Sequence, residues 1–331
     1  MDLQTNYLGM TLANPLVPSA SPLSRDVAMC CRLEDAGASA LVMYSLFEEE
    51  LDSHHARQIQ LLESREIGHS EATHFLPLHA EPSHALEQYL QQIQALKQRL
   101  SIPVIASLNG TSQDGWINIA KQLTEAGADA LELNIYNVAA DPLHSASDME
   151  KGYIELISAL RDVVTCPIMV KLSPYFSALG HFVRQLEDTG INGVSLFNRF
   201  YQPDIDPDTL RVQSSIHLSR SEDALLSMRW LGILFGKTRL TLAATGGIHS
   251  ADDAVKMLLA GADVTHLCSV LLQQGPTALS QILTGISDWL DESPYESLEQ
   301  ARGVLSHLHS NDPTLYERAS YVQLLKMGRY S

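Results

Sequence analysis

The chain carries a series of short, continuously apolar runs, and each is followed by a stretch in which apolar residues recur at helical spacing. Runs rich in Val, Ile and Leu, without alternation between apolar and polar residues, are typical of parallel strands that are covered on both faces. The pattern predicts eight such strands, at residues 15–20, 40–45, 103–108, 130–134, 167–172, 193–198, 240–245 and 264–269.

Three of the predicted helices end in the same tripeptide, Ala-Gly-Ala, at residues 36–38, 126–128 and 260–262. Glycine suits the left-handed conformation that ends many helices, after which the chain turns into the next strand. Eight strand–helix units in about 270 residues predict an α/β fold, a TIM (β/α)8 barrel that occupies residues 1–331 as a single domain. An open doubly wound sheet is the alternative, although the Gly-x-Gly-x-x-Gly motif of such sheets does not follow the first strand.

Two segments interrupt this rhythm. Residues 48–87 follow the second predicted strand and contain six histidines, and residues 199–221 follow the sixth strand. Long insertions at the carboxyl ends of barrel strands commonly build the active site, so we expect both segments to lie over the barrel mouth. The histidine-rich segment lacks a His-Glu-x-x-His motif, and we expect no metal site there.

The overall charge limits the classes of partner. The chain of 331 residues has 22 Lys and Arg against 39 Asp and Glu, which gives a net charge of −17. Such a balance argues against binding to nucleic acid or to an anionic membrane surface. The sequence shows no signal peptide, no membrane-spanning apolar run and no Cys-x-x-Cys pair. We therefore expect a cytoplasmic protein with reduced cysteines.

The ends of the predicted strands are rich in hydrogen-bonding groups, and this is the end of a barrel where active sites lie. The group has two cations and no carboxylate, which favours an anionic, planar ligand over a divalent metal ion. In chain order its members are Ser19, Ala20, Ser21, Tyr44, Ser45, Ser107, Asn109, Asn134, Lys171, Ser173, Asn198, Arg199, Gly246, Gly247, Cys268 and Ser269.

Two of these positions point to specific chemistry. Gly246 and Gly247 end the seventh predicted strand, where exposed backbone amides and the following strand end predict a phosphate site. A tight strand-to-helix turn is the alternative interpretation. Lys171 lies inside an apolar strand, where its ammonium needs an anionic partner. Two partners remain open, a bound ligand or Glu132 in the neighbouring strand.

With these motifs the chain resembles the dihydroorotate dehydrogenase superfamily of FMN-binding barrels, and it is most similar to the class 1 branch. A further stretch, Leu-Phe-Asn-Arg-Phe-Tyr-Gln-Pro-Asp-Ile-Asp at 196–206, resembles a subgroup known as dihydroorotate dehydrogenase-like proteins. The other matching stretches are Asn-Pro at 14–15, Ser-Ala-Ser at 19–21, Ala-Ser-Leu-Asn-Gly at 106–110, Leu-Glu-Leu-Asn at 131–134, Val-Lys-Leu-Ser-Pro-Tyr-Phe at 170–176 and Thr-Gly-Gly-Ile at 245–248.

The resemblance implies a homodimer with FMN across each barrel mouth. It implies that Lys171 faces the flavin edge that becomes negatively charged on reduction, and that Asn198 reaches the substrate. Gly246, Gly247, Cys268 and Ser269 would hold the phosphate group. The full set of implied flavin contacts is Ala20, Ser21, Ser45, Ser107, Asn134, Lys171, Gly246, Gly247, Cys268 and Ser269.

The chain departs from the class 1 pattern at several catalytic positions. The cysteine that serves as the base in class 1 enzymes is absent from residues 134–138, and Tyr44 replaces a lysine. Arg199 stands where those enzymes have a serine. We therefore predict an FMN-dependent oxidoreductase that transfers hydride between flavin and an unidentified anionic small molecule. Tyr136 would act as the acid or base, with Lys171 and Arg199 as the other catalytic residues.

Three alternatives remain open from the sequence. The first is a genuine dihydroorotate dehydrogenase of pyrimidine biosynthesis, in which Tyr136 or Tyr44 replaces the cysteine. The second is a non-catalytic, flavin-binding subunit that serves a redox partner protein. The third is a barrel enzyme such as an aldolase or isomerase, which would use Lys171 on a phosphorylated ligand.

Overall fold

A computed structural model of the protein describes residues 2–48, 84–110, 113–135, 137–199, 202–215 and 217–317. Most of the predicted first insertion lies outside these ranges, as do Tyr136 and residues 200–201 and 216 of the second insertion.

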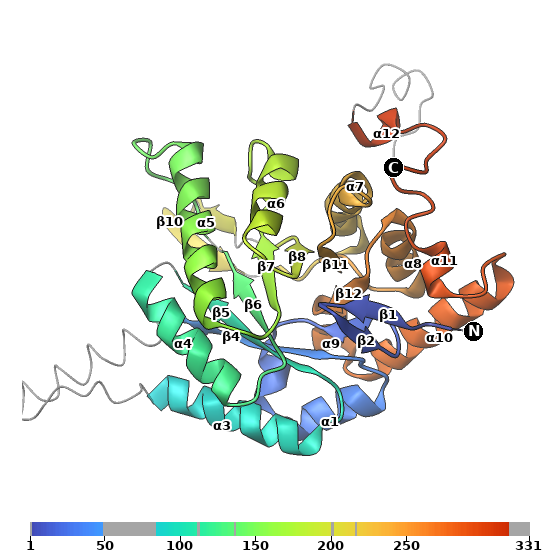
Figure 1. Ribbon diagram of the computed structural model, residues 1–331, viewed down its shortest axis with the longest axis horizontal. Coiled ribbons are helices and arrows are strands. Elements are labelled where there is room, and N and C mark those ends of the chain that lie inside the picture. Colours follow the sequence, from blue (N-terminus) through green and yellow to red (C-terminus); the bar gives the residue numbers. More distant parts are fainter. Residues whose placement is uncertain are drawn as a thin grey trace, which may run out of the picture.

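Eight parallel strands form the centre of the molecule and confirm the predicted TIM barrel (Figure 1). Each corresponds to one of the eight apolar runs, in the spatial order β3-β12-β11-β8-β7-β6-β5-β4. The backbone N–H of Ser39, just before β4, donates to the carbonyl of Leu16 in β3 and so links the two ends of the sheet. The strands are β3 (Leu16–Pro18), β4 (Leu41–Phe47), β5 (Val104–Asn109), β6 (Ala130–Asn134), β7 (Ile168–Leu172), β8 (Gly193–Leu196), β11 (Thr241–Thr245) and β12 (Val264–Leu267).

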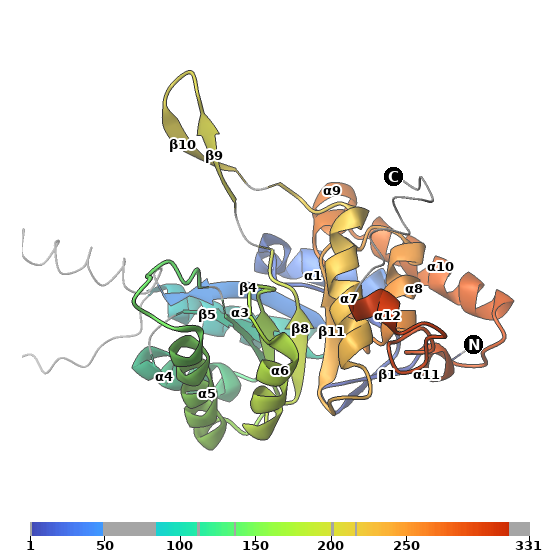
Figure 2. The same cartoon turned by 90° about the horizontal axis from the view of Figure 1, so that it is seen from above.

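Helices connect the strands and cover the outside of the barrel (Figures 1 and 2). The glycines of the three Ala-Gly-Ala tripeptides have φ of +106°, +108° and +126°, a conformation that L side chains rarely adopt, as expected for helix ends. Over the described ranges, no helix is both long and apolar enough to cross a membrane. The main helices are α1 (Val27–Asp35), α3 (His84–Arg99), α4 (Gln113–Glu125), α5 (Ala146–Val163), α6 (Leu179–Asp188), α7 (Ala224–Leu234), α8 (Ala251–Ala260) and α10 (Thr277–Glu292).

Shorter elements complete the chain. They include two 3-10 turns, η1 (Pro22–Arg25) and η2 (Ser221–Asp223). The others are the short helices α9 (Ser269–Gln274), α11 (Leu298–Ala301) and α12 (Thr314–Glu317).

An N-terminal hairpin, which the sequence pattern did not predict, packs against the inner side chains of the barrel. Its strands are β1 (Thr5–Tyr7) and β2 (Met10–Leu12). Tyr7, Leu8 and Leu12 are buried in one apolar cluster with barrel residues that include Val42 and Met169. A second, larger cluster fills the space between the strands and the surrounding helices. The hairpin therefore closes the barrel beneath the strand ends that carry the predicted site.

A second hairpin lies within the predicted insertion at 199–221. It consists of β9 (Gln202–Asp206) and β10 (Arg211–Ser215), which pair antiparallel and extend away from the body of the barrel (Figure 2). Two apolar side chains directly opposite each other, Ile205 and Val212, are 68% and 71% exposed. The hairpin of this insertion is thus an exposed arm.

Candidate functional site

Strand pairing places several of the predicted site residues side by side, in two pairs. Ser45 of β4 pairs with Ser107 of β5, and Asn134 of β6 pairs with Lys171 of β7. The Ser45 and Ser107 hydroxyls are 2.9 Å apart, and Ser107 also donates to Oε1 of Glu132 at 3.3 Å. The carboxyl ends of β4 to β7 therefore present a continuous set of polar groups.

A register shift in β4 decides which of its residues joins this set. The shift lies between Val42 and Ser45, and it leaves Ser45 beside Ser107. Tyr44 instead packs edge-on against Tyr89 of α3, with ring centroids 4.8 Å apart, and the guanidinium of Arg25 lies 4.1 Å from the Tyr44 ring centroid. The Tyr44 ring therefore lies between η1 and α3, and Ser45 rather than Tyr44 pairs with Ser107.

Lys171 and Glu132 form an ion pair on adjacent strands. The ammonium Nζ lies 3.9 Å from Oε1 of Glu132, and the two residues are 8% and 0% exposed. Within the described ranges the ammonium has no closer hydrogen-bond acceptor. The structure thus shows the Glu132 partner, one of the two alternatives drawn from the sequence. The bound ligand stays a prediction, for which the ammonium keeps donor capacity.

A buried histidine lies on the other side of Glu132. His266 Nδ1 is 3.9 Å from Oε2 of Glu132 and 3.4 Å from the Ser195 hydroxyl, while Nε2 is 3.1 Å from the hydroxyl of Tyr7. Burial, reinforced by the Lys171 ammonium, lowers the pKa of His266 to about 3. Burial also raises the pKa of Tyr7 well above its usual value. Both groups are therefore neutral at neutral pH.

Two asparagines meet across the barrel mouth. The side-chain amide of Asn198 donates to Oδ1 of Asn134 and to the carbonyl of Ile135, the latter at 3.3 Å. Arg199, the next residue, lies at the edge of this site. Its guanidinium donates to Asp223 at 2.8 Å and to the carbonyl of His217 at 2.7 Å. These contacts hold Arg199 against η2, with part of the guanidinium exposed.

The two glycines at the end of β11 both have positive φ but differ in their surroundings. Gly246 has a φ of +87°, and a Cβ there would meet nothing within 4 Å. Gly247 has a φ of +73°, and its Cβ would lie 2.3 Å from the backbone nitrogen of Ala224. Gly247 is therefore required by the packing of the turn against α7, whereas Gly246 leaves open space on its Cβ side.

Two side chains that the sequence pattern did not single out, Ser219 and His249, lie beside predicted Ser269. The backbone N–H of Ser219 donates to the hydroxyl of Ser269 at 3.0 Å, and the Ser219 hydroxyl donates to it at 2.8 Å. His249 Nε2 lies 3.3 Å from the Ser219 hydroxyl. Cys268 is the N-cap of α9, and burial raises the pKa of its thiol, although the Lys171 ammonium lowers it. Predicted Ala20 and Ser21 follow β3, immediately before η1.

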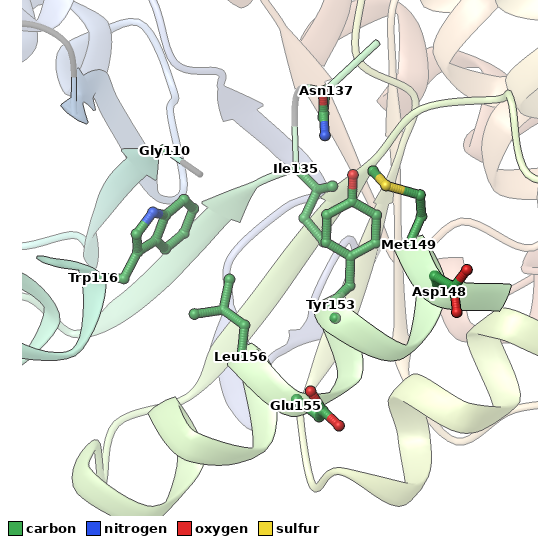
Figure 3. A pocket seen from close by; sticks show the side chains of 10 residues that line it. Gly110, Trp116, Ile135, Asn137, Asp148, Met149, Tyr153, Glu155 and Leu156 are labelled. Atoms are coloured by element: carbon green, nitrogen blue, oxygen red, sulfur yellow. The ribbon is translucent and has the colours of Figure 1, made fainter. Parts of the chain in front are cut away.

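A cavity lies beside this set of residues rather than within it (Figure 3). It has a volume of about 300 Å³ between α4 and α5. None of its ten lining residues is a predicted flavin contact. Ile135 and Asn137, which flank Tyr136, line one side, and the Tyr153 hydroxyl points toward Asn137. The cavity is therefore a neighbour of the segment that carries the predicted acid or base.

The chemistry of the strand ends is suited to the FMN that the resemblance implied. An available ammonium, paired hydroxyls and amides match the acceptors of a flavin ring, and the open side of Gly246 leaves room for a phosphate group close to backbone. Among the described residues, no group of three or more His, Cys, Asp or Glu is arranged to hold a metal ion.

A family model and the similar proteins found by comparison all point to the same family. The model of the dihydroorotate dehydrogenase family matches residues 2–290. The catalytic subunit of dihydroorotate dehydrogenase B (NAD(+)) from Methanosarcina acetivorans is 26% identical over 307 residues, which cover 91% of this chain and 95% of the relative. The corresponding subunit from Thermoplasma acidophilum is 23% identical over 92% of this chain and 98% of its own length. Dihydroorotate dehydrogenase A (fumarate) from Lactobacillus delbrueckii is 25% identical over 81% of this chain and 87% of its own.

Proposed function

We propose that this chain, which belongs to the dihydroorotate dehydrogenase family of oxidoreductases acting on CH–CH groups, is an FMN-dependent enzyme that transfers hydride between the flavin and an anionic small molecule. The observation that carries this proposal is the Lys171 ammonium, which is buried at a strand end beside paired hydroxyls and amides. A fixed cation in this position favours a ligand that gains negative charge when it is reduced.

Separate groups of residues would bind the flavin ring and its phosphate. FMN would supply the hydride-accepting position N5 of its ring. Lys171 would stabilise charge at the flavin edge, and the Ser45–Ser107 pair and Asn134 would orient the ring. Gly246, with Gly247, Cys268 and Ser269 around it, would hold the phosphate through backbone N–H groups, and Ala20 and Ser21 would line the flavin from β3.

Substrate binding would fall to Asn198 and Arg199. Asn198 uses its amide group on Asn134, so its carbonyl oxygen remains as an acceptor for a substrate N–H. Arg199 keeps one terminal nitrogen beyond its contacts with Asp223 and His217, and this nitrogen would bind a substrate carboxylate. We further propose that Tyr136, which lies outside the described residues, exchanges the substrate proton.

A direct test starts from the purified protein and the identity of any bound chromophore. We expect a flavin absorption spectrum with one FMN released per chain on denaturation. We expect Lys171→Met to weaken binding of added FMN at least tenfold, as for the loss of one charge-assisted hydrogen bond of about 1.5–3 kcal/mol. A colourless wild-type protein that does not quench the fluorescence of added FMN would contradict the proposal.

Dihydroorotate itself is the second candidate substrate, because the relatives named above carry that activity in their names. Anaerobic addition of dihydroorotate to the FMN-loaded protein separates the two candidates. Bleaching of the flavin absorbance at a rate that supports turnover would establish dihydroorotate oxidation. An unchanged spectrum, with bleaching by dithionite intact, would favour a different anionic substrate.

The expected partners follow from charge and from the relatives. We propose a cytoplasmic homodimer, as the family resemblance implies for the dimer. The net charge of −17 supports the proposal that the protein binds neither nucleic acid nor an anionic membrane. Because the Methanosarcina acetivorans relative is named a catalytic subunit, a redox partner protein is also proposed. Sedimentation of the purified protein would measure the homodimer, and sedimentation of the protein in cell extract would measure its complex with a partner.

A further inference from the structure

Glu132 is a carboxylate in an unusual place, inside the barrel and away from water. Glu132 is 0% exposed, and its Oε1 accepts a hydrogen bond from the Ser107 hydroxyl at 3.3 Å. Its other oxygen, Oε2, is buried without a hydrogen-bond partner. Burying a charged carboxylate with incomplete hydrogen bonding is costly, so the charge must be compensated by a nearby cation.

Only one neighbour can supply that compensation among the residues that the structure describes. Lys171 Nζ is 3.9 Å from Oε1. His266 Nδ1 is equally close to Oε2, but burial lowers the pKa of His266 to about 3, so this imidazole is neutral at neutral pH. The Lys171 ammonium is therefore the counter-ion of Glu132, and the two form a buried pair behind the strand ends.

The pair is asymmetric in a way that matters for a ligand at the barrel mouth. Lys171 is 8% exposed whereas Glu132 is fully enclosed, so a ligand contacts the ammonium while the carboxylate acts from behind it. At 3.9 Å the ammonium is beyond ordinary hydrogen-bond distance from Glu132, which leaves its N–H groups available. In the poorly screened barrel interior, the carboxylate still offsets much of the positive potential that Lys171 would project.

We propose that Glu132 acts through Lys171. As the counter-ion of the ammonium, Glu132 makes reduction of the bound flavin less favourable than the ammonium alone would. This inference rests on the proposed flavin function. Its physical reason is that reduction adds negative charge near Lys171, and the opposing carboxylate reduces the attraction available to that charge. The pair thus sets the reduction potential, while Lys171 makes the contact.

The test compares FMN affinities in the oxidised and reduced states for the full-length protein. We expect Glu132→Gln to raise the ratio of reduced-state to oxidised-state affinity at least tenfold, which corresponds to a midpoint potential about 30 mV higher for a two-electron couple. Lys171→Met is expected to lower the ratio. Asp263→Asn, which removes another buried carboxylate from its pair with Arg302 just before β12, is the matched control and should leave the ratio unchanged.

A second variant covers the case in which Glu132→Gln does not fold. Glu132→Asp keeps the charge but withdraws it from Lys171 by one methylene, so we expect a change in the same direction by a smaller factor. An unchanged or lowered ratio in either folded variant would overturn the inference, as would an equal change in Asp263→Asn.

A flavin-independent measurement separates failure of this inference from failure of the proposed function. In urea unfolding of the protein without FMN, Lys171→Met leaves Glu132 without its counter-ion. We therefore expect the double variant Glu132→Gln/Lys171→Met to unfold at a higher urea concentration than Lys171→Met. If the double variant is no more stable, the pair is not the counter-ion arrangement inferred here. If the pair is coupled but wild-type protein binds no FMN, the proposed function and the redox role fall together while the pairing stands.

Discussion

Asn198, just beyond β8, donates its side-chain amide to the side-chain oxygen of Asn134 at the end of β6. The same amide is 3.3 Å from the carbonyl of Ile135, so its donors are used within the protein. The contact leaves the Asn134 amide group as a donor and the Asn198 oxygen as an acceptor, because each side chain has used its other half. Because of this one interaction, Asn134 can donate a hydrogen bond to a ligand whereas Asn198 can accept one.

This division predicts different defects for two alanine variants. Asn134→Ala is expected to weaken FMN binding roughly tenfold, as for a lost hydrogen bond of about 1.4 kcal/mol. Asn198→Ala should leave FMN affinity within about twofold and instead reduce kcat/KM for the substrate by a similar factor of about ten. Fluorescence titration with FMN and steady-state kinetics measure the two effects. Equal FMN defects in both variants would contradict the assigned roles.

The two glycines at the end of β11 should also respond differently to the same substitution. Gly246→Ala introduces a left-handed alanine at a cost of about 1–2 kcal/mol but meets no neighbour, so the protein should fold. Its methyl group would enter the open space, and FMN binding is expected to fall at least tenfold. Gly247→Ala places Cβ 2.3 Å from the Ala224 backbone, so we expect a far larger loss of stability.

Thermal unfolding followed by circular dichroism, together with FMN titration, distinguishes the two effects. If Gly246→Ala bound FMN as tightly as the wild-type protein, the phosphate would lie elsewhere. If Gly247→Ala were as stable as Gly246→Ala, the turn would move freely away from α7.

The barrel could be predicted from the sequence because its signals are local. Continuous apolar runs identify buried parallel strands, and the repeated Ala-Gly-Ala marks helix ends with φ above +100°. The N-terminal hairpin escaped this approach because each of its strands has three residues, too few to show a period. Tyr7 and Leu8 become part of the inner core only through packing against strands that lie far along the chain.

In the candidate site, too, features with a local sequence signal could be predicted and those made by long-range packing could not. Lys171, Asn134 and Gly246 could be predicted because strand ends are identifiable from the run of apolar residues before them. The Tyr7–His266 contact joins residues 259 positions apart, and no local pattern carries it. Nor could the register shift in β4 be predicted, although it decides that Ser45 rather than Tyr44 meets Ser107.

The neutral state of His266 predicts a pH dependence of stability. Its pKa in the folded protein is about 3, below the ordinary value of 6.5. The unfolded chain therefore binds a proton between pH 6.5 and 3 where the folded chain does not, and stability falls as pH falls through this window. At pH 5 this group alone should lower the free energy of unfolding by about 2 kcal/mol relative to pH 7.5.

A variant without the His266 imidazole separates the contribution of His266 to the pH dependence of stability from the contributions of the other histidines. We expect His266→Phe to be less stable than wild type at pH 7.5, because Tyr7 loses its hydrogen-bond partner. The difference in the free energy of unfolding between the two proteins should narrow by about 2 kcal/mol at pH 5. Urea titrations at both pH values measure it. A constant difference would mean that His266 is already charged, or exposed, in the folded protein.

The exposed arm formed by β9 and β10 makes the proposed homodimer testable. Ile205 and Val212 lie opposite each other across the two strands and are 68% and 71% exposed, so they offer adjoining apolar surface away from the barrel. Exposed apolar surface of this kind favours association.

We expect Ile205→Lys/Val212→Lys to shift the protein from dimer to monomer in analytical ultracentrifugation, with FMN affinity within about twofold of wild type. Asp208→Lys, at an exposed position in the turn of the same hairpin, also makes the arm more positive but removes no apolar surface and should leave the dimer intact. A dimer that survives the double substitution would place the interface on another face, and dissociation by Asp208→Lys as well would make it electrostatic rather than apolar.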